Sequence, residues 1–302
     1  MRTPPDQIGH AVTVHKYMVR SKWLARRRRG ITATDVAAIL GMSKYATPLD
    51  VYLTKRDGDQ KEATYAMQRG NALEPLLIDE WHARNPDAER LVTPALVAHP
   101  ENRWAMASLD HVARIDGTQT PLEIKTAGWR QRDDWWDETR LIPDVYAVQT
   151  LWQLYVTGLD RAEVVADVAG DVRILTIERD RGWESVVVPM MADWWKRHVV
   201  GGEEPDIDPV RDYPSLKRLW IQDPGVTIDA DPLLMSDIRA YRHAAFELKD
   251  RKATADELKG RIRIAMREAS AITDPDTGRR VVSVSKNGGA LRVAEHREET
   301  TQ

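Results

Sequence analysis

The chain has 302 residues, 42% of them hydrophobic and 30% charged, which is the balance of a globular protein with its own core. It contains no cysteine, which excludes disulfides, thiol catalysis and cysteine-ligated metal centres. The formal net charge is only −3, so any binding to nucleic acid must depend on a local basic patch. The first residues contain no apolar run and no long apolar stretch follows, so we expect a cytoplasmic protein without a membrane helix.

Short helices are predicted after a polar lead at residues 1–20. One begins with Thr34 as its cap and stops at Gly41, and a second begins near Pro48. A third helix follows from Gly70 and closes before Pro86, because apolar residues recur there at helical spacing.

The pattern then changes to strands, which are predicted at 91–98, 103–108, 110–115 and 121–126. Between the last two lies Asp116-Gly117, a strong signal for a two-residue hairpin turn. A helix at 143–157, strands at 162–168 and 172–178, and a helix at 182–200 complete this region.

The C-terminal part has a different composition. Residues 204–225 are rich in proline and acidic residues and are predicted to form a linker. Beyond them, apolar residues recur at spacings of three and four up to about residue 270, which predicts a long helix or a helical hairpin. A small strand is expected at 281–285. We therefore expect a core at 21–203 and a helical, coiled-coil-like extension at 226–302.

The hairpin register places chemically significant residues together. If Asp116 and Gly117 form the loop, Asp110 lies opposite Glu123, with the Cβ atoms about 4.5–5.5 Å apart. The alternation of a strand puts Lys125 on the same face as Glu123. Two carboxylates facing each other destabilise a sheet, so this pairing indicates a bound cation such as Mg²⁺, which commonly uses one or two carboxylates and water. On this pattern alone, a surface hairpin with solvated charges is the alternative.

An ordered series of motifs surrounds the hairpin and spans about residues 23–198. The motifs are WLARRRRGITATDV at 23–36, GMSKY with TPL at 41–49, RGNALEP at 69–75, SLD at 108–110, LEIK at 122–125, YAVQ at 146–149 and LWQLYVTG at 151–158. Together they resemble the lambda exonuclease family, the YqaJ-like viral recombinase branch of the PD-(D/E)XK nucleases.

The resemblance implies a metal site. Asp110 and Glu123 would bind the metal, the Ile124 carbonyl would add a ligand, and Glu74 would complete the site from a helix. Lys125 would position or deprotonate the attacking water. Mg²⁺ is the expected ion, and Mn²⁺ is a possible substitute.

The resemblance also implies a DNA-end site. Gln149 matches the active-site glutamine of the family, and Arg27, Thr34 and Ser108 match the positions that hold the 5′-terminal phosphate. A forked guanidinium and a hydroxyl at a helix start are suited to a phosphate. Leu109 stands where the family usually has proline, and Thr34 where serine is commoner, but no ligand is lost.

The implied fold is a restriction-endonuclease-like α/β core with a central mixed β-sheet flanked by helices, followed by a C-terminal helical extension. The implied activity is Mg²⁺-dependent 5′→3′ hydrolysis of linear double-stranded DNA ends. The product would be a 3′ single strand for a phage-type annealing protein. A homo-oligomer, specifically a trimer, is expected, in the host cytoplasm if the protein is phage-encoded.

Two alternatives stay open. One is a PD-(D/E)XK endonuclease or flap nuclease, which shares the metal site. The other is a DNA-binding module that keeps the fold without cutting. The tryptophan pair Trp135-Trp136 would stack on unpaired bases in one interpretation, and packs inside the protein in the commoner one.

Overall fold

The computed structural model describes residues 7–15, 19–58, 64–92, 95–136, 142–285 and 289–294. The chain divides into two compact units, Met1–Ile221 and Gln222–Gln302. The first therefore extends past residue 203, where the sequence pattern placed the end of the core. Among the helices in the described ranges, none is long and apolar enough to cross a membrane.

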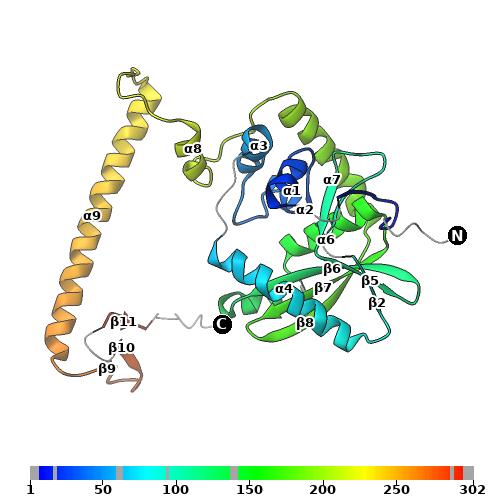
Figure 1. Cartoon of the computed structure of the whole chain (residues 1–302). Coiled ribbons are helices and arrows are strands. Elements are labelled where there is room, and N and C mark those ends of the chain that lie inside the picture. Colours follow the sequence, from blue (N-terminus) through cyan, green and yellow to red (C-terminus); the bar gives the residue numbers. More distant parts are fainter. Residues whose placement is uncertain are drawn as a thin grey trace. The chain divides into compact units, whose positions relative to one another are not determined.

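A mixed five-stranded sheet forms the centre of the first unit (Figure 1). Strands β5 to β7 lie in its middle, with β6 and β7 parallel and the other neighbours antiparallel. In spatial order the strands are β2 (Glu89–Val92), β5 (His111–Ile115), β6 (Thr118–Ala127), β7 (Arg161–Val168) and β8 (Asp171–Glu178). The predicted α/β class with a central mixed sheet flanked by helices is confirmed.

A second, three-stranded antiparallel sheet lies in the same unit and corrects two expectations. It consists of β1 (Val12–His15), β3 (Ala95–Ala98) and β4 (Met106–Leu109). The single strand predicted at 91–98 is wrong, because β2 and β3 belong to different sheets. Pro94 in the sequence is the signal that this prediction overlooked, since proline is rare inside strands. The lead at 1–20 also contains more structure than expected, because β1 pairs with β3.

Helices surround the sheets in the first unit. They are α1 (Arg20–Arg27), α2 (Ala33–Ile39), α3 (Pro48–Asp57), α4 (Tyr65–Arg84), α5 (Arg132–Trp135), α6 (Asp144–Thr157), α7 (Arg181–Trp194) and α8 (Tyr213–Leu219), with a 3₁₀ turn η1 (Trp129–Gln131) and a π-helical segment η2 (Trp195–Val200). Gly158 ends α6 with φ of 71°, as predicted from its sequence position. The third helix begins five residues before the predicted Gly70, at Tyr65, where Thr64 caps it.

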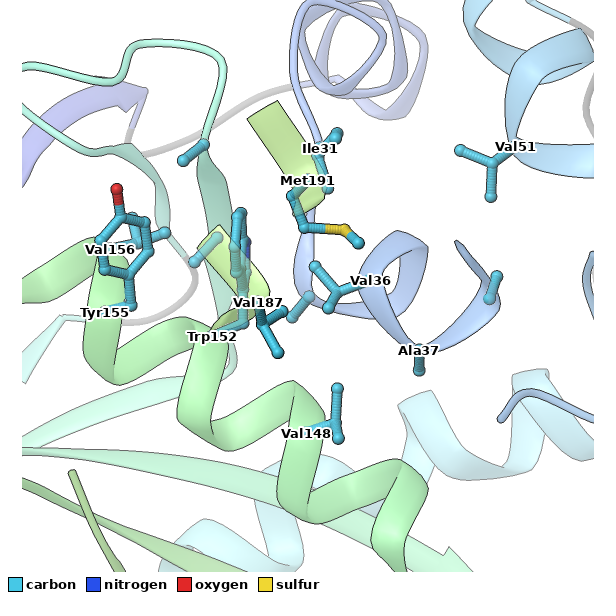
Figure 2. Close-up of a cluster of buried hydrophobic side chains, with 14 of the residues drawn as sticks. Ile31, Val36, Ala37, Val51, Val148, Trp152, Tyr155, Val156, Val187 and Met191 are labelled. Atoms are coloured by element: carbon cyan, nitrogen blue, oxygen red, sulfur yellow. The ribbon is translucent and has the colours of Figure 1, made fainter. Parts of the chain in front are cut away.

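The largest hydrophobic cluster lies between α6 and the N-terminal helices (Figure 2). Val148, Trp152 and Val156 recur at intervals of four along α6, so one face of this helix is apolar. Figure 2 shows Val148 and Trp152 on the side of α6 that faces Val36 from α2 and Met191 from α7. This cluster fixes α6 and α2, which carry several candidate site residues.

A separate cluster packs α4 against the central sheet. Leu77, Ile78 and Trp81 from α4 contact Leu122 and Ile124 of β6. Because strand side chains alternate, Glu123 and Lys125 lie on the opposite face of β6 from these apolar residues. The packing of α4 therefore determines which face of β6 carries the charges.

The segment predicted as a linker contains the helix α8. The Ser215 hydroxyl donates a hydrogen bond to Asp50 at the start of α3, and Leu216 and Leu219 pack against the main cluster. Helix α8 is therefore part of the first unit, which ends at Ile221.

The second unit contains α9 (Pro232–Met266), a single helix of 35 residues, so the helical hairpin considered for this region is not formed. An antiparallel sheet of β9 (Ala271–Thr273), β10 (Arg280–Val284) and β11 (Leu291–Val293) follows, with β10 in the middle. The predicted closing strand corresponds to β10.

Candidate active site

The β5–β6 hairpin has the predicted register. Ile115 pairs with Thr118 across a two-residue loop, and the pairing continues to His111 opposite Leu122. Asp116 and Gly117 have φ of 48° and 80°, the left-handed values that this kind of tight turn requires. The next step of the register brings Asp110 beside Glu123.

Hydrogen bonds hold the two carboxylates in place. The Ile124 main-chain N–H donates to Asp110 Oδ2 at 2.9 Å. The buried Glu123 accepts a hydrogen bond from Lys125 Nζ on its Oε1. Thus Asp110, Glu123 and Lys125, three residues that the sequence pattern placed on one face, lie together.

The charges of this cluster perturb one another. Burial and the neighbouring Glu123 raise the pKa of Asp110 well above its usual range. Burial opposes the charge of Lys125, but Glu123 and Asp110 outweigh it, so the pKa of Lys125 is raised. Burial and Glu123 also raise the pKa of Glu74, with Lys125 acting in the opposite direction. The structure therefore brings Glu74 from α4 into the same electrostatic cluster.

Helix α6 contributes two glutamines, of which the sequence pattern singled out only Gln149. Gln153 Nε2 donates to Glu123 Oε2 at 2.5 Å and to the Ser108 main-chain oxygen at 3.2 Å. Gln149 is buried one turn earlier, and its Oε1 has no hydrogen-bond partner among the described residues. Gln153 was missed although its spacing of four from Gln149 places both on one helix face.

An aromatic side chain from the same helix contacts Lys125. Lys125 Nζ lies 5.3 Å from the ring centroid of Tyr146, within the range of a cation–π interaction. Tyr146 in turn stacks on Trp135 of α5, with ring centroids 5.3 Å apart. Trp135 is buried, which confirms the packing interpretation for this member of the tryptophan pair.

Arg27 and Thr34, two of the three residues predicted to bind a 5′-phosphate, are in direct contact. Arg27 Nη2 donates to Thr32 Oγ1 at 2.7 Å and to Thr34 Oγ1 at 2.9 Å. The Arg27 guanidinium also lies 4.5 Å from the Trp23 ring centroid. The cap of α2 is Thr32 and not Thr34 as expected, because the Thr32 N–H donates to Asp35 Oδ2.

A largely buried ion pair supports the predicted phosphate-binding group of Arg27, Thr32 and Thr34, which we name the phosphate cradle. Lys55 Nζ lies 2.6 Å from Asp35 Oδ2, and the Lys55 side chain is only 3% exposed. Lys55 also donates to the Arg27 carbonyl at 3.1 Å. Burial opposes the charge of Asp35, but Lys55 and Arg27 outweigh it and lower the pKa of Asp35. Burial lowers the pKa of Lys55 against the effect of Asp35.

Ser108, the third predicted phosphate ligand, lies on β4. Its buried Oγ has no hydrogen-bond partner in the described part of the chain, while its carbonyl accepts from Gln153. Ser108 is therefore linked through Gln153 to Glu123 and the carboxylate cluster.

A surface pocket of about 630 Å³ lies between α2 and α6. Thr34 lines it on the α2 side and Gln149 on the α6 side, with Lys44 and Tyr45 from the α2–α3 loop and Gln131 before α5. The pocket is wide enough for a small organic group such as a nucleotide.

The donor set fits a divalent cation that takes few protein ligands. Within the described ranges, no three Asp, Glu or His side chains gather closely enough to form a complete metal cage. Asp110 and Glu123 nevertheless offer hard oxygen atoms side by side, and the repulsion that raises the pKa of Asp110 is what a cation relieves. Mg²⁺ keeps several waters and commonly binds one or two carboxylates, so these residues suit it.

Comparisons with known proteins agree with the sequence motifs. Residues 22–160 match the model of the YqaJ-like viral recombinase domain. The uncharacterized protein YqaJ of Bacillus subtilis strain 168 is 29% identical over 264 residues, covering 83% of this chain and 80% of that protein.

Solved structures with a similar arrangement are more distant. An alkaline exonuclease, LHK-Exo, from Laribacter hongkongensis is 21% identical, with a TM-score of 0.49 over 66% of this chain and 98% of that chain. A phage related exonuclease from Haemophilus somnus 129PT is 12% identical, with a TM-score of 0.41 over 58% of this chain and 96% of that chain.

Proposed function

We propose that this protein, whose residues 22–160 match the model of the YqaJ-like viral recombinase domain, is a divalent-metal-dependent exonuclease. Its substrate is linear double-stranded DNA. It degrades one strand in the 5′→3′ direction from the duplex end and leaves the other as a 3′ single strand for recombination. Mg²⁺ is the proposed ion, with Mn²⁺ as a substitute.

One observation supports the proposal most: two carboxylates and a lysine lie together on one sheet face, and the two carboxylates repel each other. Asp110 lies beside Glu123 and has a raised pKa, and Lys125 donates to Glu123. A protein that needed only stability would not keep two like charges together in a buried place. Perturbed titrating groups beside a pocket are typical of a catalytic site.

In the proposed mechanism Asp110, Glu123 and the Ile124 carbonyl would hold the cation, and Glu74 would complete the site through a metal-bound water, because no three acidic side chains of the described residues gather closely enough to bind one ion directly. A divalent cation held there would supply polarisation of the phosphoryl oxygen and acidification of the attacking water. Gln153 fixes the orientation of Glu123 through its hydrogen bond. The raised pKa of Lys125 keeps its ammonium charged, so it positions the phosphate and stabilises the negative charge that develops there. Gln149 offers its unpartnered oxygen to the pocket side of the site.

The proposed end recognition uses the phosphate cradle. The Arg27 guanidinium is already oriented by its hydrogen bonds to Thr32 and Thr34. A terminal phosphate would accept hydrogen bonds from the same guanidinium. The exposed Thr34 hydroxyl faces the pocket that reaches Gln149. Ser108 contributes its unpaired hydroxyl. This preference for a 5′-phosphate distinguishes an end-dependent exonuclease from an endonuclease with the same metal site.

The test is digestion of 5′-phosphorylated linear duplex and of covalently closed circular DNA, each with Mg²⁺ or with EDTA. The proposal predicts Mg²⁺-dependent loss of the linear form from its 5′ ends while the circle stays intact. Cutting of the circle would instead identify an endonuclease. Absence of any cutting, with DNA binding retained, would identify a non-cutting module.

Several finer expectations stay predictions. They concern a trimeric assembly, a single-strand annealing partner and the cytoplasmic location. Light scattering on the whole chain and on a variant that ends before residue 226 would measure the first of these.

A further inference from the structure

Trp129 is a large apolar side chain left in solvent next to the candidate active site. It is 73% exposed and follows directly after β6, the strand that carries Glu123 and Lys125 and ends at Ala127. Tryptophans are usually mostly buried, so this exposure needs a reason.

The backbone around Trp129 is held firmly, so the exposure does not come from a loose loop. The Gly128 N–H donates to the Gln131 side-chain oxygen at 2.8 Å, and the Gln131 N–H donates to the Gly128 carbonyl at 3.0 Å. Six residues on, Trp135 is buried and stacks on Tyr146. The segment is thus fixed at both ends, and Trp129 projects from it with little entropy left to lose on binding.

The same segment forms part of the pocket wall. Gln131 and Asp134 line the pocket that extends to Thr34 and Gln149. Tyr146, which holds Trp135, also contacts Lys125. Trp129 therefore belongs to the same short turn as Gln131, which contributes to the wall of this pocket.

Cationic side chains accompany the exposed tryptophans of this segment. The Arg130 guanidinium lies 5.4 Å from the Trp129 ring centroid. Trp136, which is 39% exposed, has Arg132 and Arg173 at 5.1 and 4.9 Å from its ring centroid. Aromatic faces combined with arginines are the usual means of binding unpaired bases and their backbone.

We infer that Trp129 is a stacking platform for an unpaired base of single-stranded DNA, with Arg130 contacting the adjoining phosphate. The inference rests on the proposed function in one respect, namely that hydrolysis of one strand supplies the unpaired strand that binds here. Trp129 holds the uncut strand and keeps it apart from the strand under hydrolysis. It is a binding residue and takes no part in bond breaking.

The experiment is equilibrium binding of a fluorescein-labelled oligothymidylate, measured by anisotropy in EDTA so that no hydrolysis occurs. Trp129→Ala is expected to raise the Kd for the single strand roughly tenfold, which is the loss of one base–aromatic stack. Trp129→Phe keeps an aromatic face and is expected to restore most of the affinity. A blunt hairpin duplex, which offers no unpaired base to the platform, is expected to bind Trp129→Ala nearly as well as the original chain.

Trp220→Ala is the matched control, because Trp220 is also exposed, at 54%, and lies outside the pocket at the end of α8. An unchanged Kd in Trp129→Ala, or an equal loss in Trp220→Ala, would overturn the inference. So would absence of single-strand binding by the original chain, or a change of molecular mass in Trp129→Ala that reveals a contact between copies. Because no cleavage is measured, the effect of Trp129→Ala on single-strand binding can be interpreted even if the protein proves not to be a nuclease.

Discussion

Two partly buried aspartates of this protein have opposite electrostatic surroundings. Asp35 lies against Lys55 and near Arg27, and these cations lower its pKa despite burial. Asp110 lies beside Glu123, and burial together with that like charge raises its pKa. Both aspartates accept main-chain hydrogen bonds, from Thr32 and from Ile124 respectively. The difference therefore comes from the neighbouring charges.

The comparison separates an ion-paired aspartate from one that lies beside a like charge. Asp35 is paired with Lys55 and supports the proposed phosphate cradle. Burial and Glu123 make the charged form of Asp110 unfavourable in the free protein, and a bound cation would relieve that repulsion. Such local conflicts are expected at functional sites and rare elsewhere.

Removal of the positive charge at the candidate active site should have the largest effect. Lys125→Ala is expected to reduce hydrolysis of linear duplex by on the order of 10²–10³-fold or more, because a preorganised charge beside the phosphate is lost. Single-turnover hydrolysis with Mg²⁺ measures the rate, and binding in EDTA should stay near that of the original chain. Lys196→Ala, at an exposed lysine on η2, is the control. A turnover close to normal in Lys125→Ala would remove this catalytic assignment.

Breaking the supporting ion pair should mainly affect stability. Lys55→Met leaves Asp35 buried without its partner and is expected to lower the free energy of unfolding by about 3–5 kcal/mol. Urea denaturation followed by circular dichroism measures it. The double variant with Asp35→Leu should recover much of the loss, since the unpaired charge is gone. A Lys55→Met protein as stable as the original would contradict the buried pair.

Removal of the cradle cation should affect the choice of DNA end. Arg27→Ala is expected to weaken binding of 5′-phosphorylated ends roughly ten- to hundredfold, as for a lost hydrogen bond to a charged group. Ends with a 5′-hydroxyl should lose much less. Equal losses on both kinds of end would show that Arg27 is a general phosphate contact.

Acid should weaken the supporting pair gradually. Because the pKa of Asp35 is lower in the folded chain, its stabilising effect is complete above the usual aspartate value of about 3.9 and is lost as the pH falls through the depressed value. The difference in unfolding free energy between the original chain and Asp35→Asn should therefore shrink below about pH 4. A difference that stays constant across that range would contradict the lowered pKa.

The hairpin shows what could be predicted from the sequence. Asp116-Gly117 sets a two-residue turn, the turn sets the register, and the register places Asp110 by Glu123. Each of these steps is local, so no knowledge of distant packing was needed. The contact of Gln153 with Glu123 could also have been predicted, because helix periodicity puts Gln153 on the same face of α6 as Gln149.

Other features depend on packing between distant segments. The pairing of Asp35 with Lys55 requires α2 and α3 to meet, and neither residue carries a local signal for it. The division of residues 91–98 between two sheets depends on distant pairing, because β2 pairs with β5 whereas β3 pairs with β1 and β4. Which of the three tryptophans between residues 129 and 136 is buried also depends on packing, because Trp135 stacks on Tyr146 of α6 whereas Trp129 and Trp136 stay exposed.

The most direct test of the central claim is Asp110→Asn, measured for both hydrolysis and stability. Asparagine keeps an oxygen that accepts from the Ile124 N–H but removes the charge that opposes Glu123. We predict that Mg²⁺-dependent hydrolysis of 5′-phosphorylated linear duplex is lost while the metal-free protein unfolds at an equal or higher urea concentration. Hydrolysis at the original rate, or a clear loss of stability, would contradict the claim that Asp110 is kept for a cation at the expense of stability.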